Sequence, residues 1–257
     1  MLLLTAALTA AALQGTTQGT DFRWSGTLPA GKTIELRGVN GAINASATSG
    51  REVRVSATKR ARRSDVASVE IRVEEHEDGV TICAIYPNQR STSGCRDDGR
   101  RNRDGRNNEE NDVEVDFTVE VPATVKFAGR TVNGDVEATG LTADAEVSTV
   151  NGDVEVSTRG MAEATTVNGD VVARVGRGDW SGPAEFTTVN GSVTVTLPAS
   201  VNADVSASTV NGDISTDFPL TVRGRFGPRR LTGTIGSGGR SLSLKTVNGS
   251  IAIEREG

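Results

Sequence analysis

Oxygen-bearing side chains recur at regular intervals along the second half of the chain, and they are the first candidates for chemistry. Stacked carboxylates repel one another unless they point into water or share a cation, and calcium prefers such oxygen ligands. The glycine-rich nonapeptide of calcium-binding β-rolls is absent, and serine stands at two of the positions. We therefore expect solvated turn residues and no metal site, with cation binding along this row as the alternative. The row consists of Asp135, Asp153, Asp170, Ser192, Asp213 and Ser250.

Other residues that enzymes use are scarce. The one histidine, His76, stands in the acidic stretch 74–78, which favours an exposed turn over a metal ligand. Two tryptophans and one tyrosine are too few for the aromatic platforms of polysaccharide enzymes. The sequence contains no Gly-x-Ser-x-Gly, no phosphate-binding loop and no zinc spacing. We predict no catalytic residue and no cofactor. The enzymatic alternative is a polysaccharide-active β-helix that draws a carboxylate pair from the Asp row.

The two cysteines, Cys83 and Cys95, bracket a short segment of the first half. In an exported protein they can form a disulfide, which would contribute about 3 kcal/mol by closing this loop. Two free thiols are the alternative. We expect the bridge.

The oxygen-bearing residues belong to a repeat, and the repeat determines which elements position them. Its copies start 18, 17, 22, 21 and 37 residues apart, and a degenerate copy spans 38–43. This spacing fits one coil of two or three short strands. The long last interval predicts a coil with an altered corner within 220–245. The hexapeptide Thr-Val-Asn-Gly-Asp/Ser-Val/Ile begins at Thr131, Thr149, Thr166, Thr188, Thr209 and Thr246.

Apolar and polar residues alternate on both sides of each Asn-Gly, and the phase changes there. Ala145 and Val147 share the inward parity before Asn151, whereas Val154 and Val156 have the opposite parity after it. One extra residue at each corner explains the change, since glycine accepts a positive φ. Asn-Gly is also a hairpin signal, so an antiparallel meander is the main alternative. Nearly verbatim repetition favours stacking of like on like. We therefore predict an all-β fold, a parallel β-solenoid whose core is roughly 30–35 Å long.

Stacking would turn equivalent residues into ladders. The asparagines share the inward parity of the threonines, so we expect them to bond one another at a buried corner, in a structural role. They are Asn133, Asn151, Asn168, Asn190, Asn211 and Asn248. The preceding valines point outward and are a candidate contact surface for another protein or for self-assembly, unless they simply cover one another. They are Val132, Val150, Val167, Val189, Val210 and Val247.

Composition and the first residues indicate the compartment. The chain is 35% hydrophobic and 4% aromatic with a net charge of −5, which fits a thin core and excludes the basic stripe of a nucleic-acid binder. Residues 1–15 form a short apolar run that ends in small residues, as in a secretory signal, although it lacks a basic start. The run is too short for a membrane anchor. We predict export to the periplasm, outer envelope or cell surface, with no membrane span in the mature chain.

The first half divides into strands and one polar gap. Alternating runs predict strands at 21–28, 51–57, 69–73, 80–86 and 113–121, so 20–125 would form an irregular β-rich cap and the first coil. The solenoid would follow over 126–257. The stretch near 91–112 has almost no apolar residue, and we expect a disordered loop there. The cap would cover an edge that otherwise invites aggregation.

The sequence resembles a bacterial "putative adhesin" family of β-strand-repeat proteins, a domain family of unknown function found in cell-envelope proteins. The resemblance rests on Val119-Glu120-Val121-Pro122-Ala123 followed by the recurrent Thr-Val-Asn-Gly-Asp-Val units, and it covers about 30–257. It implies a solenoid on an exported protein and transfers no catalytic residue. We predict a non-enzymatic envelope protein that offers a repetitive surface for adhesion, scaffolding or assembly to a protein or glycan partner. A glycan- or cation-binding module is the alternative.

Overall fold

The structure is a computed structural model, and it describes residues 16–18, 21–87, 95, 111–176, 180, 182–222 and 229–257. The expected signal segment 1–15 lies outside the described residues. Most of the expected disordered loop, 91–94 and 96–110, also lies outside them.

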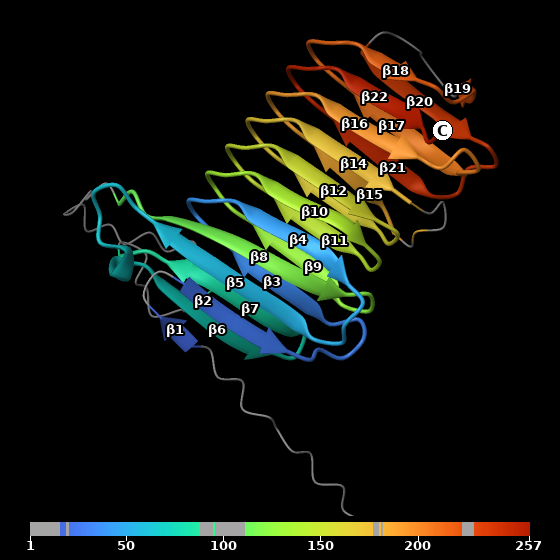
Figure 1. The fold of residues 1–257 in the computed structure, drawn as a ribbon. Helices are drawn as coiled ribbons and strands as arrows, with labels where there is room; N and C mark the ends of the chain where they lie inside the picture. The colour runs from blue at the N-terminus through green and yellow to red at the C-terminus, as the bar shows by residue number, and fades with distance from the viewer. Residues whose placement is uncertain are drawn as a thin grey trace, which may run out of the picture.

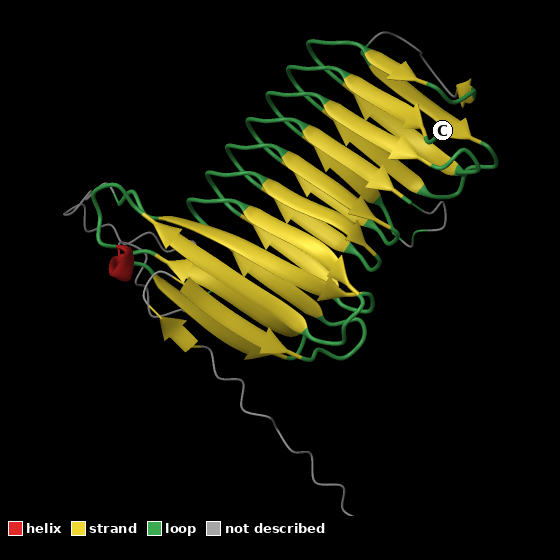
Figure 2. Ribbon diagram, in the orientation of Figure 1, coloured by secondary structure: helices red, strands yellow, loops and turns green. Residues whose placement is uncertain are grey.

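The described chain forms a rod of two β-sheets that face each other across a thin core (Figures 1 and 2). Each sheet contains eleven strands. One coil consists of a strand in sheet B, a Thr-Val-Asn-Gly corner, a strand in sheet A and a return turn. The first coil comprises β3 (Thr33–Arg37) and β4 (Ile43–Thr48), which flank the degenerate copy of the motif. The predicted parallel β-solenoid is confirmed.

The later coils repeat this arrangement. Their strands in sheet B are β9 (Lys126–Arg130), β11 (Ala145–Ser148), β13 (Ala162–Thr165), β15 (Ala184–Thr187), β17 (Ala203–Ser208) and β21 (Ser241–Lys245). Their strands in sheet A are β10 (Val136–Leu141), β12 (Val154–Thr158), β14 (Val171–Val175), β16 (Val193–Leu197), β18 (Ile214–Thr216) and β22 (Ile251–Arg255).

Parallel pairing places equivalent residues on top of one another. Val154 pairs with Val136 below it and with Val171 above it, and all three side chains are buried. Small and β-branched side chains suit this thin interior, because each stacks on a copy of itself across the pleated sheet. The alternation seen in the sequence therefore corresponds to side chains that point into or out of the rod.

The coils do not stack in sequence order. β22 lies between β16 and β18 in sheet A, and β21 lies between β15 and β17 in sheet B. The last copy of the motif is thus inserted between the two copies that precede it in the chain.

The segment expected to form a coil with an altered corner does not do so, and that prediction was wrong. It forms β19 (Leu220–Val222) and β20 (Arg230–Ile235), which pair antiparallel, and β20 pairs antiparallel with β17. The chain therefore reverses direction at this end of sheet B. After the reversal it forms its last coil between the two preceding coils of the stack. This reversal gives β17 a partner on its outer side.

At the other end of the rod, β8 (Glu114–Pro122) and β7 (Gly79–Ile85) join the sheets in parallel and the strands beyond them pair antiparallel. Sheet A continues past β4 through β8, β5 (Val53–Arg60), β2 (Asp21–Gly26) and β1 (Thr16–Gln18). Sheet B continues past β3 through β7 and β6 (Glu70–His76). A 3₁₀ turn, Val66–Ser68, precedes β6 in the chain. Among the described residues, no helix has the length and apolar character needed to cross a membrane.

Candidate functional site

The repeated corner is held from inside by its threonine. Thr149 and Thr166 are buried, and each hydroxyl donates to the carbonyl oxygen of the corner glycine in the coil below. For Thr166 the acceptor is Gly152 at 2.9 Å, and for Thr149 it is Gly134 at 2.9 Å. The hydroxyl satisfies a carbonyl that the turn removes from the sheet ladder, which explains why threonine precedes Val-Asn-Gly in all six full copies of the motif.

The corner glycine is required by both conformation and space. Gly169 has a φ of 154°, and a Cβ placed on it would lie 2.0 Å from the carbonyl oxygen of Gly152. Any larger residue would push the coils apart, so the one-residue phase change of the sequence corresponds to a backbone that only glycine fits.

The asparagines form a continuous chain of side-chain amides. Asn151 Nδ2 donates to Asn133 Oδ1 at 2.8 Å, and Asn168 Nδ2 donates to Asn151 Oδ1 at 2.8 Å. The prediction of a buried corner was wrong, because all three of these asparagines are exposed. The turn that follows the inward threonine brings the amide to the rim of the rod, where its neighbours are other amides. All the amides point in one direction, and their order along the rod is Asn40, Asn133, Asn151, Asn168, Asn190, Asn248 and Asn211.

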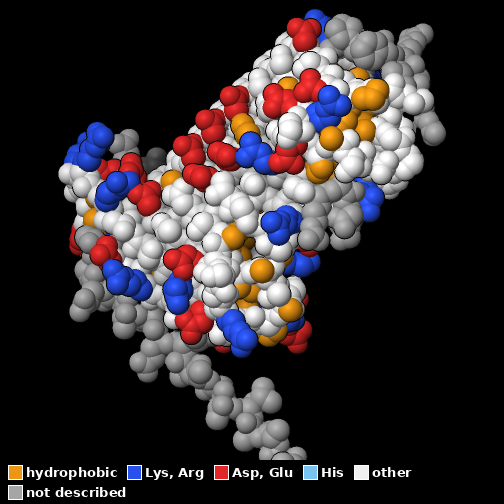
Figure 3. All heavy atoms as spheres, turned by 45° about the vertical axis from the view of Figure 1, so that its right-hand side comes forward, with side chains coloured by type: hydrophobic (Ala, Val, Ile, Leu, Met, Phe, Trp, Pro, Cys, Tyr) orange, Lys and Arg blue, Asp and Glu red, His pale blue; other side chains and the backbone are white. Residues whose placement is uncertain are grey.

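The Asp row also connects one coil to the next. Asp153 Oδ1 accepts from the backbone N–H of Asp170 at 2.8 Å, and Asp170 Oδ1 accepts from that of Ser192 at 2.7 Å. Below the first coil, Asp116 performs the same function for the N–H of Ala42 at 3.0 Å. Figure 3 shows acidic side chains in a line along one long edge of the rod, with others scattered over the lower part of the same face. Within the described residues, no group of three or more His, Cys, Asp or Glu is arranged to hold a metal ion.

The outward valines form an exposed apolar stripe beside the amides, which we call the valine ridge. Its interior members are 37–39% exposed, and Val210 at the end of the stack is 55% exposed. Exposed large apolar side chains are unusual in a regular array, since most such residues find cover. Along the rod the ridge runs Val132, Val150, Val167, Val189, Val247 and Val210.

This stacked corner motif lies within a segment that matches a known family model. The model for Toastrack DUF4097 matches residues 112–254, more than half of the chain. The chain belongs to the Toastrack DUF4097 family.

Solved structures with an overall likeness to this Toastrack chain are distant from it. One is a "putative cell adhesion protein" from Clostridium sporogenes, with 13% identity and a TM-score of 0.47, covering 91% of this chain and 99% of that one. Another is a "putative adhesin" from Bacteroides fragilis, with 12% identity and a TM-score of 0.36, covering 93% of this chain and 98% of that one. At these scores neither likeness carries an argument. No curated protein matches the chain.

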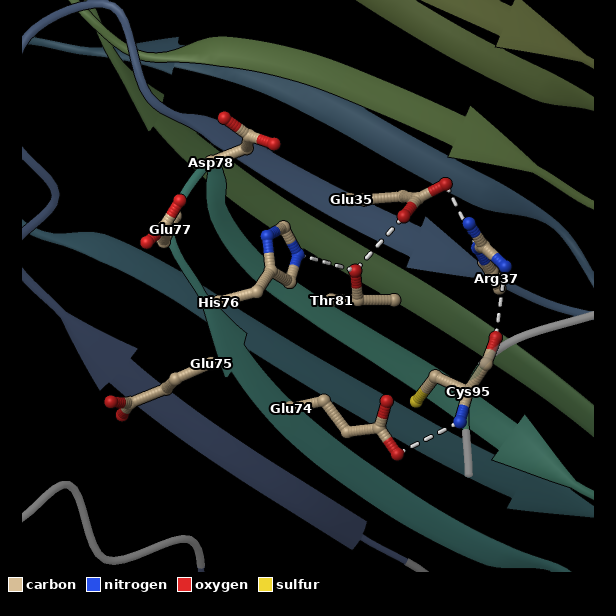
Figure 4. A pocket seen from close by; sticks show the side chains of 9 residues that line it. All are labelled: Glu35, Arg37, Glu74, Glu75, His76, Glu77, Asp78, Thr81 and Cys95. Atoms are coloured by element: carbon tan, nitrogen blue, oxygen red, sulfur yellow. Dashed lines mark hydrogen bonds and ion pairs between the residues drawn. The ribbon is translucent and has the colours of Figure 1, made fainter. Parts of the chain in front are cut away.

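The Toastrack rod also has a hollow of about 620 Å³ in its N-terminal part, between β3, β6 and β7 (Figure 4). Several of the polar groups that line it are hydrogen-bonded to one another. Thr81 Oγ1 donates to Glu35 Oε2 at 2.9 Å, and His76 Nε2 lies 3.0 Å from the same Thr81 oxygen. Glu35 Oε1 accepts from Arg37 Nε at 2.8 Å.

His76 is not placed to act as a general base for Thr81. Thr81 has one hydroxyl proton, and it points to Glu35, so the His76 nitrogen facing Thr81 must donate rather than accept. As a general base, His76 would have to accept that proton. The sequence identified His76 and its acidic neighbours but gave no sign of Glu35 or Thr81, because the three come together only through the pairing of β7 with both β3 and β6.

The disulfide lies at the rim of the same hollow. Cys83 in β7 bonds Cys95 with an S–S distance of 2.06 Å. Arg37 Nη1 donates to the carbonyl oxygen of Cys95 at 2.8 Å, and the Cys95 N–H donates to Glu74 Oε1 at 2.9 Å. The hollow residues Arg37 and Glu74 thus fix Cys95 against β3 and β6, a structural task.

A row of glutamates on the outer face of sheet B was missed in the sequence. Parallel register places Glu163 between Glu146 and Glu185. Partial burial and these two neighbouring carboxylates raise the pKa of Glu163. Arg130 pairs with Glu146, and Lys245 Nζ lies 2.7 Å from Glu185, so cations stand at both ends of the row. The sequence did contain a signal for this row, because Glu146, Glu163 and Glu185 stand at the same distance before the threonine of three copies of the motif.

Proposed function

We propose that this Toastrack protein is a non-enzymatic cell-envelope protein whose solenoid offers a repetitive surface for adhesion, scaffolding or assembly. The observation that carries the proposal is the valine ridge, a line of exposed apolar side chains repeated once per coil. Its partner is a protein or glycan of the envelope or surface.

The width of the ridge limits the kind of contact it makes. A stable protein interface buries about 800 Å² on each partner. A single file of partly exposed valines offers much less apolar surface, so each coil contributes a weak contact. Contacts made by several coils at once add in free energy, as in other multivalent systems. The ridge therefore suits an elongated or repetitive partner.

The polar groups beside the ridge support a contact role. The Asn amides bond one another and the Asp Oδ1 atoms accept backbone N–H groups, so both rows are fixed in position before a partner arrives. A preformed surface loses little side-chain entropy on binding. Repetition of the same corner also gives no coil a unique arrangement suited to catalysis.

The disulfide supports the proposed location. Disulfides persist in the periplasm, at the cell surface and outside the cell, whereas the cytosol keeps thiols reduced. The Cys83–Cys95 bridge would be stable only after export of the chain.

Binding of purified, labelled protein to envelope fractions tests the ridge. The double variant Val150→Lys/Val189→Lys should lose at least tenfold in affinity, because two desolvated contacts are replaced by charges at roughly 1 kcal/mol or more each. Val172→Lys is the matched control, since Val172 is 42% exposed but lies in β14 on the outer face of sheet A.

The outcomes are distinct. Loss in the double variant with retention in Val172→Lys supports the ridge as the contact surface. If the double variant folds, as judged by circular dichroism, and binds like the parent protein, the ridge is not that surface.

A further inference from the structure

The interior coils present nearly the same set of hydrogen-bonding groups to the coil above them, with the hydroxyl of Ser192 or Ser250 in place of an Asp carboxylate in two coils. In the coil of Asn151, the N–H of Gly152 donates to Asn168 O at 3.0 Å, and the N–H of Val154 donates to Asp170 O at 2.9 Å. Its carbonyl at Val150 accepts from the N–H of Asn168 at 2.8 Å. Three more groups of this coil accept hydrogen bonds from the coil above. Gly152 O accepts from Thr166 Oγ1, and Asn151 Oδ1 accepts from Asn168 Nδ2. Asp153 Oδ1 accepts from the backbone N–H of Asp170.

The last coil of the stack has this set with no coil above it. Its corner spans 209–213, and β18 pairs with β22 on one side only among the described strands. Within the described part of the chain, no partner bonds the N–H groups of Gly212 and Ile214 or the carbonyls of Val210 and Gly212. The same holds for Asn211 Oδ1 and the carboxylate of Asp213.

The opposite end of the ladder is closed by the protein itself. Val115 N donates to Asn40 O at 2.7 Å, and Asp116 accepts from the N–H of Ala42. Tyr86 hydrogen-bonds to Asn40 and donates to Val113 O at 2.8 Å. In a second copy of this chain with the same fold, the groups below the first motif are therefore already hydrogen-bonded within that copy. Such a copy cannot stack on β18 through this motif.

We propose that the open end of the rod at β18 docks a strand of a different protein chain that carries Thr-Val-Asn-Gly-Asp and adds parallel to β18. This site is separate from the proposed role of the valine ridge and does not depend on it. The docked strand continues the coil-to-coil contact of the rod by one step, as strand addition does in other sheets.

The contact specifies the incoming sequence. Its threonine donates to Gly212 O and its asparagine amide donates to Asn211 Oδ1, as Thr166 and Asn168 do one coil further down. Its glycine must lack a Cβ, since an equivalent Cβ at Gly169 would lie 2.0 Å from the glycine carbonyl below. Its valine covers Val210, whose 55% exposure exceeds that of the interior ridge members by roughly one sixth of the side chain.

The test uses the full chain and a synthetic peptide with the sequence of residues 149–158, which contains one complete motif and the sheet A strand that follows it but leaves out the sheet B strand, whose place beside β17 is taken by β20. The control peptide replaces the Asn-Gly of the motif with Asp-Ala. We expect the first peptide to bind at least tenfold more tightly by calorimetry or fluorescence anisotropy. Equal binding of the two peptides, or binding of neither at millimolar concentration, overturns the proposal.

Two variants locate the binding. Ile214→Pro removes an N–H that faces the open side and leaves the hydrogen bonds to β22 intact, as proline does on edge strands. Asp213→Ala removes the terminal carboxylate and serves if the proline variant is unstable. Each should weaken peptide binding at least tenfold, whereas Ile214→Val should bind like the parent. Unchanged binding in both variants overturns the site.

Sedimentation of the full chain alone tests whether a second copy of the chain occupies the open edge of β18. We expect no association that depends on Ile214. Self-association that Ile214→Pro abolishes would show that a second copy fills the edge, and it would overturn the proposed occupant.

Discussion

The two ends of the rod stop the same sheets in different ways. At the N-terminal end the strands reverse direction, and β5, β2 and β6 continue the sheets antiparallel. At the other end sheet B is reversed by β20, but sheet A ends at the three-residue β18, still parallel to its neighbour. Identical repeats define a stack but provide no way to end it, so the terminating strands must come from sequence outside the repeat.

The cap and the repeats also differ in the size of the side chains that they bury. The cap buries large side chains such as Trp24, Phe117 and Tyr86, whereas the repeats bury mostly valine and alanine. A cap that departs from the repeat must fill an irregular space, and aromatic rings do so efficiently. Burial raises the pKa of Tyr86 to about 12, consistent with a phenol that stays protonated and donates to Val113. The edge strand β6 carries Glu70, Arg72 and Glu74, charges that discourage further pairing.

The largest expected difference in stability is between a glycine substitution in the repeats and one in the cap. Gly169→Ala should cost several kcal/mol and lower the melting temperature by about 10 °C or more, because its Cβ would meet a backbone carbonyl. Gly31 in the cap has a φ of 81°, but a Cβ added to it would meet nothing within 4 Å, so Gly31→Ala should cost about 1 kcal/mol. Calorimetry measures both, and equal losses would contradict the corner geometry.

A smaller difference in stability is expected between replacing an asparagine inside the amide chain and replacing one at its end. Asn168→Ala removes two amide hydrogen bonds, those to Asn151 and from Asn190, and should cost about 1–2 kcal/mol. Asn211→Ala at the open end removes one and should cost about half as much. Denaturant titration compares them. A larger loss for Asn211 would mean that its Oδ1 has an internal partner.

The smallest effect concerns the glutamate row that only the repeats possess. Because the folded-state pKa of Glu163 is raised above its usual value of 4.5, the charged form destabilises the fold at neutral pH. Glu163→Gln should therefore raise the melting temperature by about 1 °C at pH 7, a modest change because the site is largely solvated. The gain should vanish as the pH falls through the raised pKa to below about 4. A gain that persists in acid would rule out charge repulsion as its cause.

Much of the repeat region was predictable because its signals are local. Alternation around Asn151 and the phase change at Gly152 define strands and a corner, and both are properties of a few consecutive residues. The strands at Val80 and Val115 followed from the same alternation, and the ridge valines have the outward orientation that parity assigned.

The rest depends on contacts between distant segments. The exposed position of the asparagines depends on how the chain turns after the threonine, which parity alone does not describe. Near-identical copies cannot encode their own order, since Asn248 bonds Asn190 and Asn211 with the same atoms that any other copy would use. The insertion of the last coil follows instead from the reversal at β20, which lies outside the motif.

The order of the stacked copies is the most direct test of the account, because the valine ridge and the open end both depend on it. Thr194 pairs with Ala252, and Ala252 pairs with Ser215. The double variant Thr194→Cys/Ala252→Cys should therefore cross-link rapidly within one molecule, whereas Thr194→Cys/Ser215→Cys should not. Rapid cross-linking of the 194–215 pair would show that the copies stack in sequence order and would contradict the structure.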